Sequence, residues 1–247
     1  MNELKDILIK NNWMTEKEIN TVFTSEIEKC IKERTTPKDK KHIFNSFTGL
    51  LPEQVKVLII GQDPYPDEQR AHGLAFSFGD GKPAEDSLKN IFTKIENELG
   101  IKNINTDLTC WKKQGVLLLN TALTFNKDSQ NSHLNLWKNF ISKIISTLLD
   151  VKNKTQEPLV IMLWGRKANE LKNLTFAGTK EKDEEIFQNK YPNIKIIRCS
   201  HPSNNYNSNN KPIFSGKLPS FSDCEIFKPC NEFLKKHNSQ PINWQTD

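Results

Sequence analysis

The chain has 247 residues, of which 36% are apolar, so it can bury a sizeable hydrophobic core in one domain or two. Its formal net charge of +5 permits a polyanionic partner without requiring one, because scattered surface lysines explain the excess equally well. No apolar run approaches the roughly 18 residues of a membrane span, which argues against a membrane protein.

Helical and strand patterns alternate along the chain. The first segment, "MNELKDILIKNNW" (1–13), is amphipathic and contains acidic residues, which predicts a helix and not a signal peptide. A second helical pattern covers 15–34, so residues up to about 40 are expected to form an N-terminal helical segment. Four short runs rich in leucine or β-branched residues are typical of buried parallel strands: 55–60, 115–120, 158–163 and 194–199. Apolar residues at helical spacing predict helices over 88–99, 137–148 and 225–237.

This alternation predicts a single α/β domain over residues 1–247, with no repeat, long linker or compositional break to divide it. We expect a central, mainly parallel, twisted four-stranded sheet flanked by helices on both faces. Ligands of such sheets bind at the carboxyl ends of the strands. Each predicted strand ends in polar or special residues, namely Gly61-Gln62-Asp63, Asn120, Trp164-Gly165 and Ser200-His201. The sequence therefore predicts a site at this edge of the sheet.

Four motifs identify a family that the sequence resembles. They are "GQDPY" (61–65), "AHGLAFS" (71–77), "QGVLLLN" (114–120) and "HPS" (201–203). In this order and spacing they resemble the family-1 uracil-DNA glycosylases, from about residue 43 to "PINW" at 241–244. The resemblance implies a monomeric enzyme without metal or cofactor. Such an enzyme flips uracil out of DNA and hydrolyses its N-glycosidic bond, leaving an abasic site for base-excision repair.

Asp63 and His201 match the residues that carry catalysis in this family. Breaking the glycosidic bond builds positive charge on the sugar and negative charge on the departing uracil. The resemblance implies that Asp63 positions the attacking water and stabilises the sugar cation. It also implies that a neutral His201 donates a hydrogen bond to uracil O2. The structural alternatives are a turn-forming Asp before proline and a histidine that serves only the core or a loop.

Four further residues match the family's uracil pocket. Asn120 can present a donor and an acceptor to the O4 and N3–H edge of uracil, and it would meet cytosine with the wrong pattern. Tyr65 is similar to the residue that fills the space beside C5, where the thymine methyl would collide. Phe76 is expected to stack on the flipped base, and Gln62 to contact uracil through backbone and side chain. A strand-ending Asn120 and a Phe76 that belongs to the core remain the alternatives.

The resemblance places the DNA contacts on Ser87, Gly165, Arg166, Ser203, Asn205 and Tyr206. Ser87 opens a helix in "KPAEDSLKN" (82–90), where its hydroxyl and the helix N-terminus can meet a phosphate, or where it serves only as an N-cap. Glu85 and Asp86 add unexpected negative charge beside this position. Arg166 stands where the family often has serine, and it offers a charged donor to phosphate.

The chain departs from the family pattern at two places. Many relatives have histidine after "GQDPY", where this chain has Pro66. The family also carries a leucine after "HPS" that wedges into the base stack, and the aligned residue here is Asn205. Tyr206 is the nearest substitute wedge, although the long polar loop over 204–222 can equally be a surface loop. The charged stretch over 178–190 is expected to be a solvated insertion.

Two alternatives to the enzyme remain open. The main one is a glycosylase-fold protein that binds DNA or assists a polymerase with weak or lost catalysis. The presence of Asp63, Asn120 and His201 together argues against it. A mismatch-specific glycosylase would instead favour Asn at position 63 and a residue smaller than Tyr65.

The expected partner is uracil-containing DNA, single- or double-stranded, and a DNA-mimic inhibitor protein is a candidate second partner. Five cysteines without a C-x-x-C pair predict free thiols and no metal site. Free thiols suit a reducing compartment. We expect the bacterial cytoplasm and nucleoid, or the nucleus or host cell if the source is eukaryotic or viral.

Overall fold

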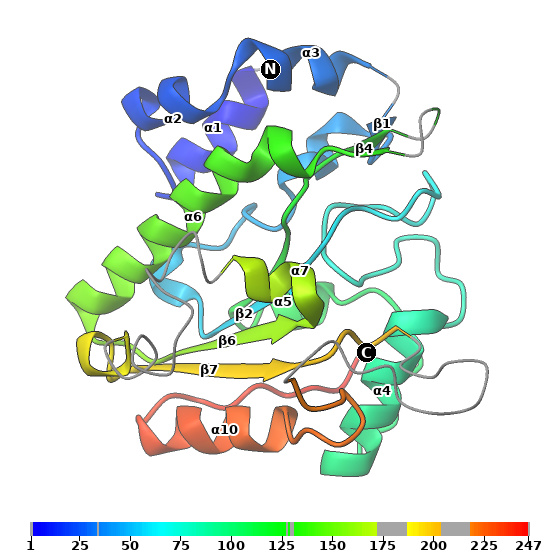
Figure 1. The fold of residues 1–247 in the computed structure, drawn as a ribbon, viewed down its shortest axis with the longest axis vertical. Coiled ribbons are helices and arrows are strands. Elements are labelled where there is room, and N and C mark those ends of the chain that lie inside the picture. The colour runs from blue at the N-terminus through cyan, green and yellow to red at the C-terminus, as the bar shows by residue number, and fades with distance from the viewer. Residues whose placement is uncertain are drawn as a thin grey trace.

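The computed structural model describes residues 2–33, 35–126, 128, 131–171, 187–203 and 218–246. Figure 1 shows the arrangement of the helices and strands. In chain order they are α1 (Asn2–Lys10), α2 (Glu16–Val22), α3 (Ser25–Lys32), β1 (Thr35–Thr36), η1 (Lys40–Phe44), η2 (Pro52–Gln54), β2 (Val57–Gly61), α4 (Asp86–Leu99), α5 (Thr109–Lys112), β3 (Val116–Asn120), β4 (Phe125–Asn126), β5 (Asn131–Ser132), α6 (Leu134–Thr155), β6 (Leu159–Trp164), α7 (Gly165–Glu170), β7 (Ile194–Cys199) and α10 (Phe227–Lys236). None of the helices within these ranges combines the length and the apolar character that crossing a bilayer requires.

The four predicted strands form one sheet in the order β3-β2-β6-β7, and every pair in it is parallel. The register places Gly61 beside Asn120 and Trp164 beside Cys199, so the carboxyl ends of the strands lie along one edge. Strand β2 pairs with both β3 and β6, and the chain must cross from one side of β2 to the other after β3. A crevice for ligands is expected at the carboxyl ends of the strands where the strand order reverses in this way. The prediction of a parallel four-stranded sheet is confirmed.

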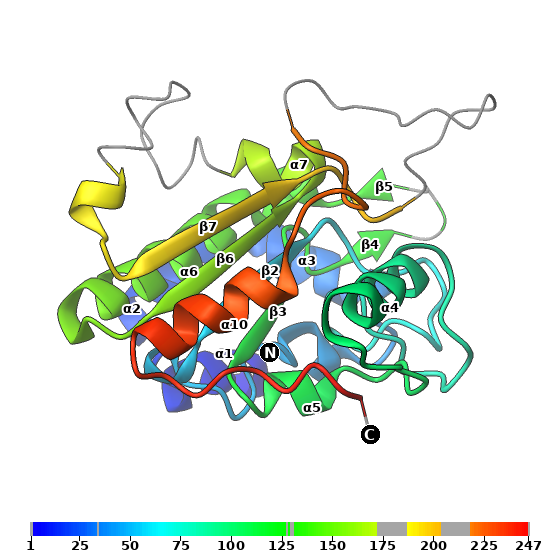
Figure 2. The same ribbon diagram turned by 90° about the horizontal axis from the view of Figure 1, so that it is seen from below.

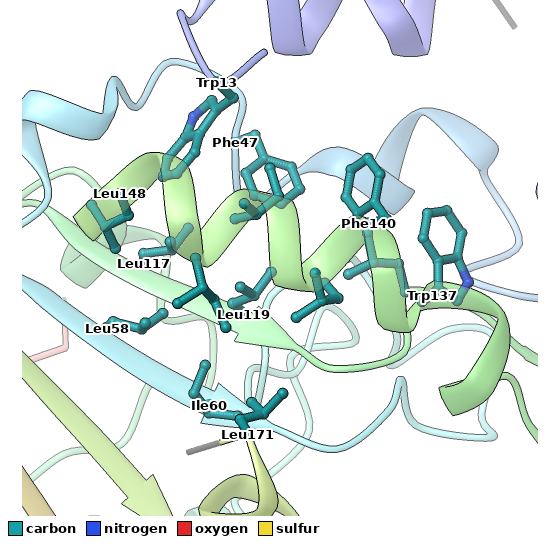
Figure 3. Packing of buried hydrophobic residues seen from close by; sticks show 14 of the residues in the cluster. Trp13, Phe47, Leu58, Ile60, Leu117, Leu119, Trp137, Phe140, Leu148 and Leu171 are labelled. Atoms are coloured by element: carbon teal, nitrogen blue, oxygen red, sulfur yellow. The ribbon is translucent and has the colours of Figure 1, made fainter. Parts of the chain in front are cut away.

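Helices cover both faces of the sheet, as the sequence predicts. Alternate strand residues point to opposite faces, and all five residues of β2 are buried. On one face Leu58 and Ile60 belong to the same hydrophobic cluster as Trp137 and Phe140 of α6 and the buried residues of the N-terminal helices (Figure 3). On the other face the neighbouring β2 residues pack against α4, α5 and α10. Figure 2 shows α10 lying across this second face, with the N-terminal helices behind the sheet.

Local structure differs from the sequence prediction most clearly in the N-terminal helices and in a second sheet. The helix expected over 15–34 is interrupted, because the Thr24 side chain accepts a hydrogen bond from the Ile27 N–H and begins a second helix, α3. A small antiparallel sheet, β1-β4-β5, was not predicted. Its strands have two residues each, which is too short for a period-two pattern to show in the sequence.

Candidate active site

A pocket of about 140 Å³ lies at the carboxyl edge of the sheet. Seven of the predicted site residues line it: Gln62, Asp63, Tyr65, Phe76, Ser87, Asn120 and His201. They come from the loop after β2, the first turn of α4, the end of β3 and the loop after β7. The volume is below the roughly 300–1,000 Å³ of pockets for drug-sized ligands, so the pocket suits one small ring.

The ends of β2 and β3 are tied together at the floor of the pocket. Thr121 donates its backbone N–H to the Gly61 carbonyl at 3.0 Å and its hydroxyl to the Gln62 carbonyl at 2.8 Å. Gly61 has no room for a side chain. A Cβ there would lie 2.2 Å from Asn120 Oδ1 and 2.8 Å from the Ala75 Cβ. Glycine at this position therefore allows the Asn120 amide to pass directly over β2.

Two polar side chains reach the pocket from these strand ends. Asn120 is only 6% exposed, and its amide makes no hydrogen bond within the described part of the chain. A buried amide normally has partners, so this one is available to a ligand. Asp63 is partly buried and accepts a hydrogen bond from Gln62 Nε2 at 3.3 Å. A long bond of this kind leaves most of the acceptor capacity of the Asp63 carboxylate unused.

His201 is held in one orientation by the residue two positions further on. The backbone N–H of Ser203 donates to His201 Nδ1 at 3.0 Å, and the Ser203 hydroxyl lies 2.7 Å from the same nitrogen. A backbone N–H can only donate, so Nδ1 is unprotonated and the neutral ring carries its proton on Nε2. Burial lowers the pKa of His201 below its usual value, and the negative charge of Asp63 opposes this shift only in part. The imidazole is therefore neutral at pH 7.

Gly165 makes the position of His201 possible. The glycine has φ +84°, and a Cβ there would lie 2.8 Å from the Cβ of His201. Both the backbone conformation and the close approach favour glycine. Gly165 thus brings the start of α7 against the histidine loop, although the sequence predicted it only as a DNA contact.

Aromatic side chains form one wall of the pocket. Phe76 has φ +64°, a conformation that bulky residues rarely adopt and that costs about 1–3 kcal/mol. Its ring centroid lies 5.4 Å from Trp164 and 6.0 Å from His201. Tyr65 donates its hydroxyl to the Phe76 carbonyl at 3.3 Å and packs edge-on against Phe78. Strain held in place by such contacts is typical of functional sites.

Ser87 lies at the pocket but is not an N-cap. Glu85 is the cap residue of α4, so Ser87 is the second residue inside the helix, and the N-cap alternative is wrong. The charge of Glu85 is also compensated, because its carboxylate pairs with Arg70 at 2.9 Å. Arg70 contacts Asp80 at 3.2 Å as well. The negative charge that the sequence placed beside the pocket is thus partly neutralised.

The remaining predicted DNA contacts are not among the residues that line the pocket. Ser203 and Arg166 are exposed and do not line the pocket, although Ser203 bonds to His201, which does. Asn205 and Tyr206 lie outside the described residues. Pro66 lines the pocket, as do Gly61 and Pro64 of the "GQDPY" motif. Three further residues that were not predicted as site residues also line it, namely Ala71, Gly73 and Leu74. These three belong to the "AHGLAFS" motif, which was the available signal. Among the residues that the structure describes, no three His, Cys, Asp or Glu side chains gather to hold a metal ion.

Comparisons with known proteins show the family of this chain. The family model described as the uracil DNA glycosylase superfamily matches residues 48–238. A protein of Geobacillus sp. (strain WCH70) named uracil-DNA glycosylase is 36% identical, covering 97% of this chain and 98% of that protein. One of Chlamydia muridarum with the same name is also 36% identical, covering 83% of this chain and 79% of the relative. Among solved structures, the mimivirus uracil-DNA glycosylase superposes with a TM-score of 0.71 at 27% identity, covering 99% of this chain and 87% of that one.

Proposed function

The chain belongs to the uracil DNA glycosylase superfamily, and from this premise we propose that its pocket binds uracil flipped out of DNA and hydrolyses the N-glycosidic bond. One observation carries the assignment of residues. The carboxylate of Asp63, the amide of Asn120 and the imidazole of His201 line the same small pocket, although they come from three different strand ends. A module that only binds DNA has no use for this trio, so the alternative without catalysis is disfavoured.

His201 stabilises the leaving group. Uracil departs with negative charge that collects partly on O2. The Nε2–H of the neutral imidazole can donate a hydrogen bond to this oxygen, so the ring does not have to be cationic. The Ser203 N–H keeps Nδ1 unprotonated, which leaves Nε2 as the donor. A fixed donor of this kind in a site that excludes water contributes about 3–4 kcal/mol to transition-state stabilisation.

Asp63 acts on the sugar side of the bond. Its carboxylate can stabilise the positive charge that grows on the deoxyribose and can accept a hydrogen bond from the attacking water. Gln62 donates to this carboxylate and so restricts its orientation. Asp63 at this position also argues against a mismatch-specific glycosylase, for which the sequence pattern would have Asn.

Three residues select uracil. The open amide of Asn120 offers Oδ1 to the N3–H of uracil and Nδ2 to its O4, while cytosine presents the reverse pattern at these positions. Such a mispaired buried amide rejects the wrong base by a factor on the order of 10⁴. Tyr65 is fixed by its bond to the Phe76 carbonyl and fills the space that a C5 methyl would need. Phe76 supplies the stacking surface.

The DNA backbone is proposed to contact Ser87, Ser203 and the start of α7 at Gly165 and Arg166. Asn205 and Tyr206 remain proposed contacts on the basis of the sequence. The mimivirus relative is known in complex with UGI, an inhibitor protein, and we propose that this chain, acting as a monomer, binds an inhibitor of the same kind. The proposed place of action is the compartment that holds the DNA.

Release of free uracil from a uracil-containing oligonucleotide tests the proposal. We expect Asp63→Asn and His201→Leu each to lower kcat by at least roughly 10²-fold. The thermal midpoint should stay near that of the wild-type protein, because both residues lie at the pocket and not in the core. Near-normal turnover by either variant would remove that residue from the mechanism. Absence of uracil release from the wild-type protein would instead favour the binding-only alternative.

A further inference from the structure

A hydrogen bond from α4 reaches the peptide group next to His201. The Asn90 Nδ2 donates to the carbonyl of Pro202 at 2.6 Å. This carbonyl and the N–H of Ser203 belong to the same planar peptide group. That N–H is the donor that meets His201 Nδ1 at 3.0 Å. Asn90 is therefore connected to the imidazole through one rigid plane.

Two more side chains of α4 bind the chain further on, over residues 222–228. Lys94 donates from Nζ to the carbonyl of Ser222 at 2.8 Å. The carboxylate of Glu98 accepts the backbone N–H groups of Ile226, Phe227 and Lys228 at 2.7–2.9 Å. Residues 90, 94 and 98 are four apart, so they share one face of the helix. This face of α4 therefore binds the chain at Pro202, directly after His201, and again over residues 222–228.

We propose that Asn90 is a positioning residue for the reaction: it orients the Pro202–Ser203 peptide so that the N–H points at His201 Nδ1 and the ring keeps its proton on Nε2. A planar peptide cannot turn its carbonyl without turning its N–H, so a donor that fixes the carbonyl also fixes the N–H. A hydrogen bond to the carbonyl also polarises the N–H, which strengthens the next bond by about 10–30%. The inference rests on the role proposed for His201 as the donor to uracil O2.

Substitution of Asn90 separates this role from simple packing. Asn90→Ala removes the donor, and Asn90→Asp keeps the shape but sets an acceptor against the Pro202 carbonyl. Asn97→Asp is the matched control, because it makes the same change at an exposed position of the same helix. NMR of the ring nitrogens in the free protein reports the tautomer and pKa of His201, and steady-state kinetics on a uracil oligonucleotide report kcat and KM.

We expect the wild-type protein and Asn97→Asp to show one neutral tautomer with the proton on Nε2. Both Asn90 variants should show mixed tautomers and a higher pKa for His201. Loss of one net hydrogen bond predicts a kcat about three- to ten-fold lower for Asn90→Ala, with KM nearly unchanged. The effect of Asn90→Asp should be larger.

An unchanged tautomer and pKa in both Asn90 variants would overturn the inference, whether or not stability and activity fall. A lower kcat without a change of tautomer would mean that Asn90 has only a structural role, and this result would also overturn the inference. The NMR measurement uses the protein without substrate. Failure of the wild-type protein to release uracil would therefore count against the proposed function alone.

Discussion

Replacing Gly61 with alanine should disable the pocket by displacing the Asn120 amide. The new Cβ would lie 2.2 Å from Asn120 Oδ1, and ordinary contacts begin at 3.4 Å, so the amide oxygen must move by more than about 1 Å. The backbone does not resist alanine here, because Gly61 is not among the residues with positive φ. The collision alone decides the outcome.

The magnitude follows from two general values. A displacement of about 1 Å in a reacting group costs on the order of 10²-fold in rate, so kcat/KM for uracil release should fall by roughly that factor. Crowding against the Ala75 Cβ at 2.8 Å should destabilise the fold by about 1–3 kcal/mol. For a chain of this length that is a fall in Tm of about 2–12 °C, well short of unfolding at 25 °C.

A double-mutant cycle with Asn120→Ala makes the test specific. If Gly61→Ala acts through the amide, adding it to Asn120→Ala should lower kcat/KM little further, because the colliding group is already absent. Uracil release and thermal unfolding would be measured for all four proteins of the cycle. Additive losses in kcat/KM, or a Gly61→Ala variant with wild-type activity, would refute the placement of Asn120 over β2.

Three other predictions concern the pocket and the loop after it. Tyr65→Ala should admit thymine and Asn120→Asp should admit cytosine, and an unbroadened set of released bases in variants still active on uracil would contradict this account of selectivity. Burial lowers the pKa of His201, so the unfolded chain binds its proton more readily, and the free energy of unfolding should hold above about pH 6.5 and fall as pH drops below it. Chemical denaturation of the wild-type protein and His201→Leu between pH 5 and 8 checks this sign, since the wild type should lose more stability on acidification. Asn205→Leu should raise activity on duplex DNA selectively, because an apolar side chain offsets the cost of unstacking better than an amide does. If Tyr206 is the wedge instead, Tyr206→Ala should lose duplex activity and keep single-strand activity, and an unchanged ratio in both variants would place the wedge elsewhere.

Local patterns in the sequence were sufficient for the four strands of the parallel sheet and for most of the pocket. The runs that became β2, β3 and β6 are short, apolar and bounded by polar residues, because these strands are buried on both faces. The edge strand β7 is partly exposed and includes Lys195 and Arg198, but its isoleucines still indicate a strand. The pocket side chains follow from the same fact. Parallel strands in register bring their carboxyl ends to one edge, so the sequence alone predicts that Asp63, Asn120 and His201 lie close together.

Contacts that depend on how the helices pack on the sheet could not be predicted from local patterns in the sequence. Gly61 in "GQDPY" looks like a turn glycine, and only the approach of β3 shows that it makes room for Asn120. Glu85 looks like a charge that repels DNA until the fold brings Arg70 to it. Nothing in the sequence around Asn90 indicates that it bonds to Pro202, which is 112 residues away. Sequence periodicity shows which residues of a single helix or strand are buried. The pairings named here join residues of different elements, and they depend on how α4, the strands and the loops pack together in the folded protein.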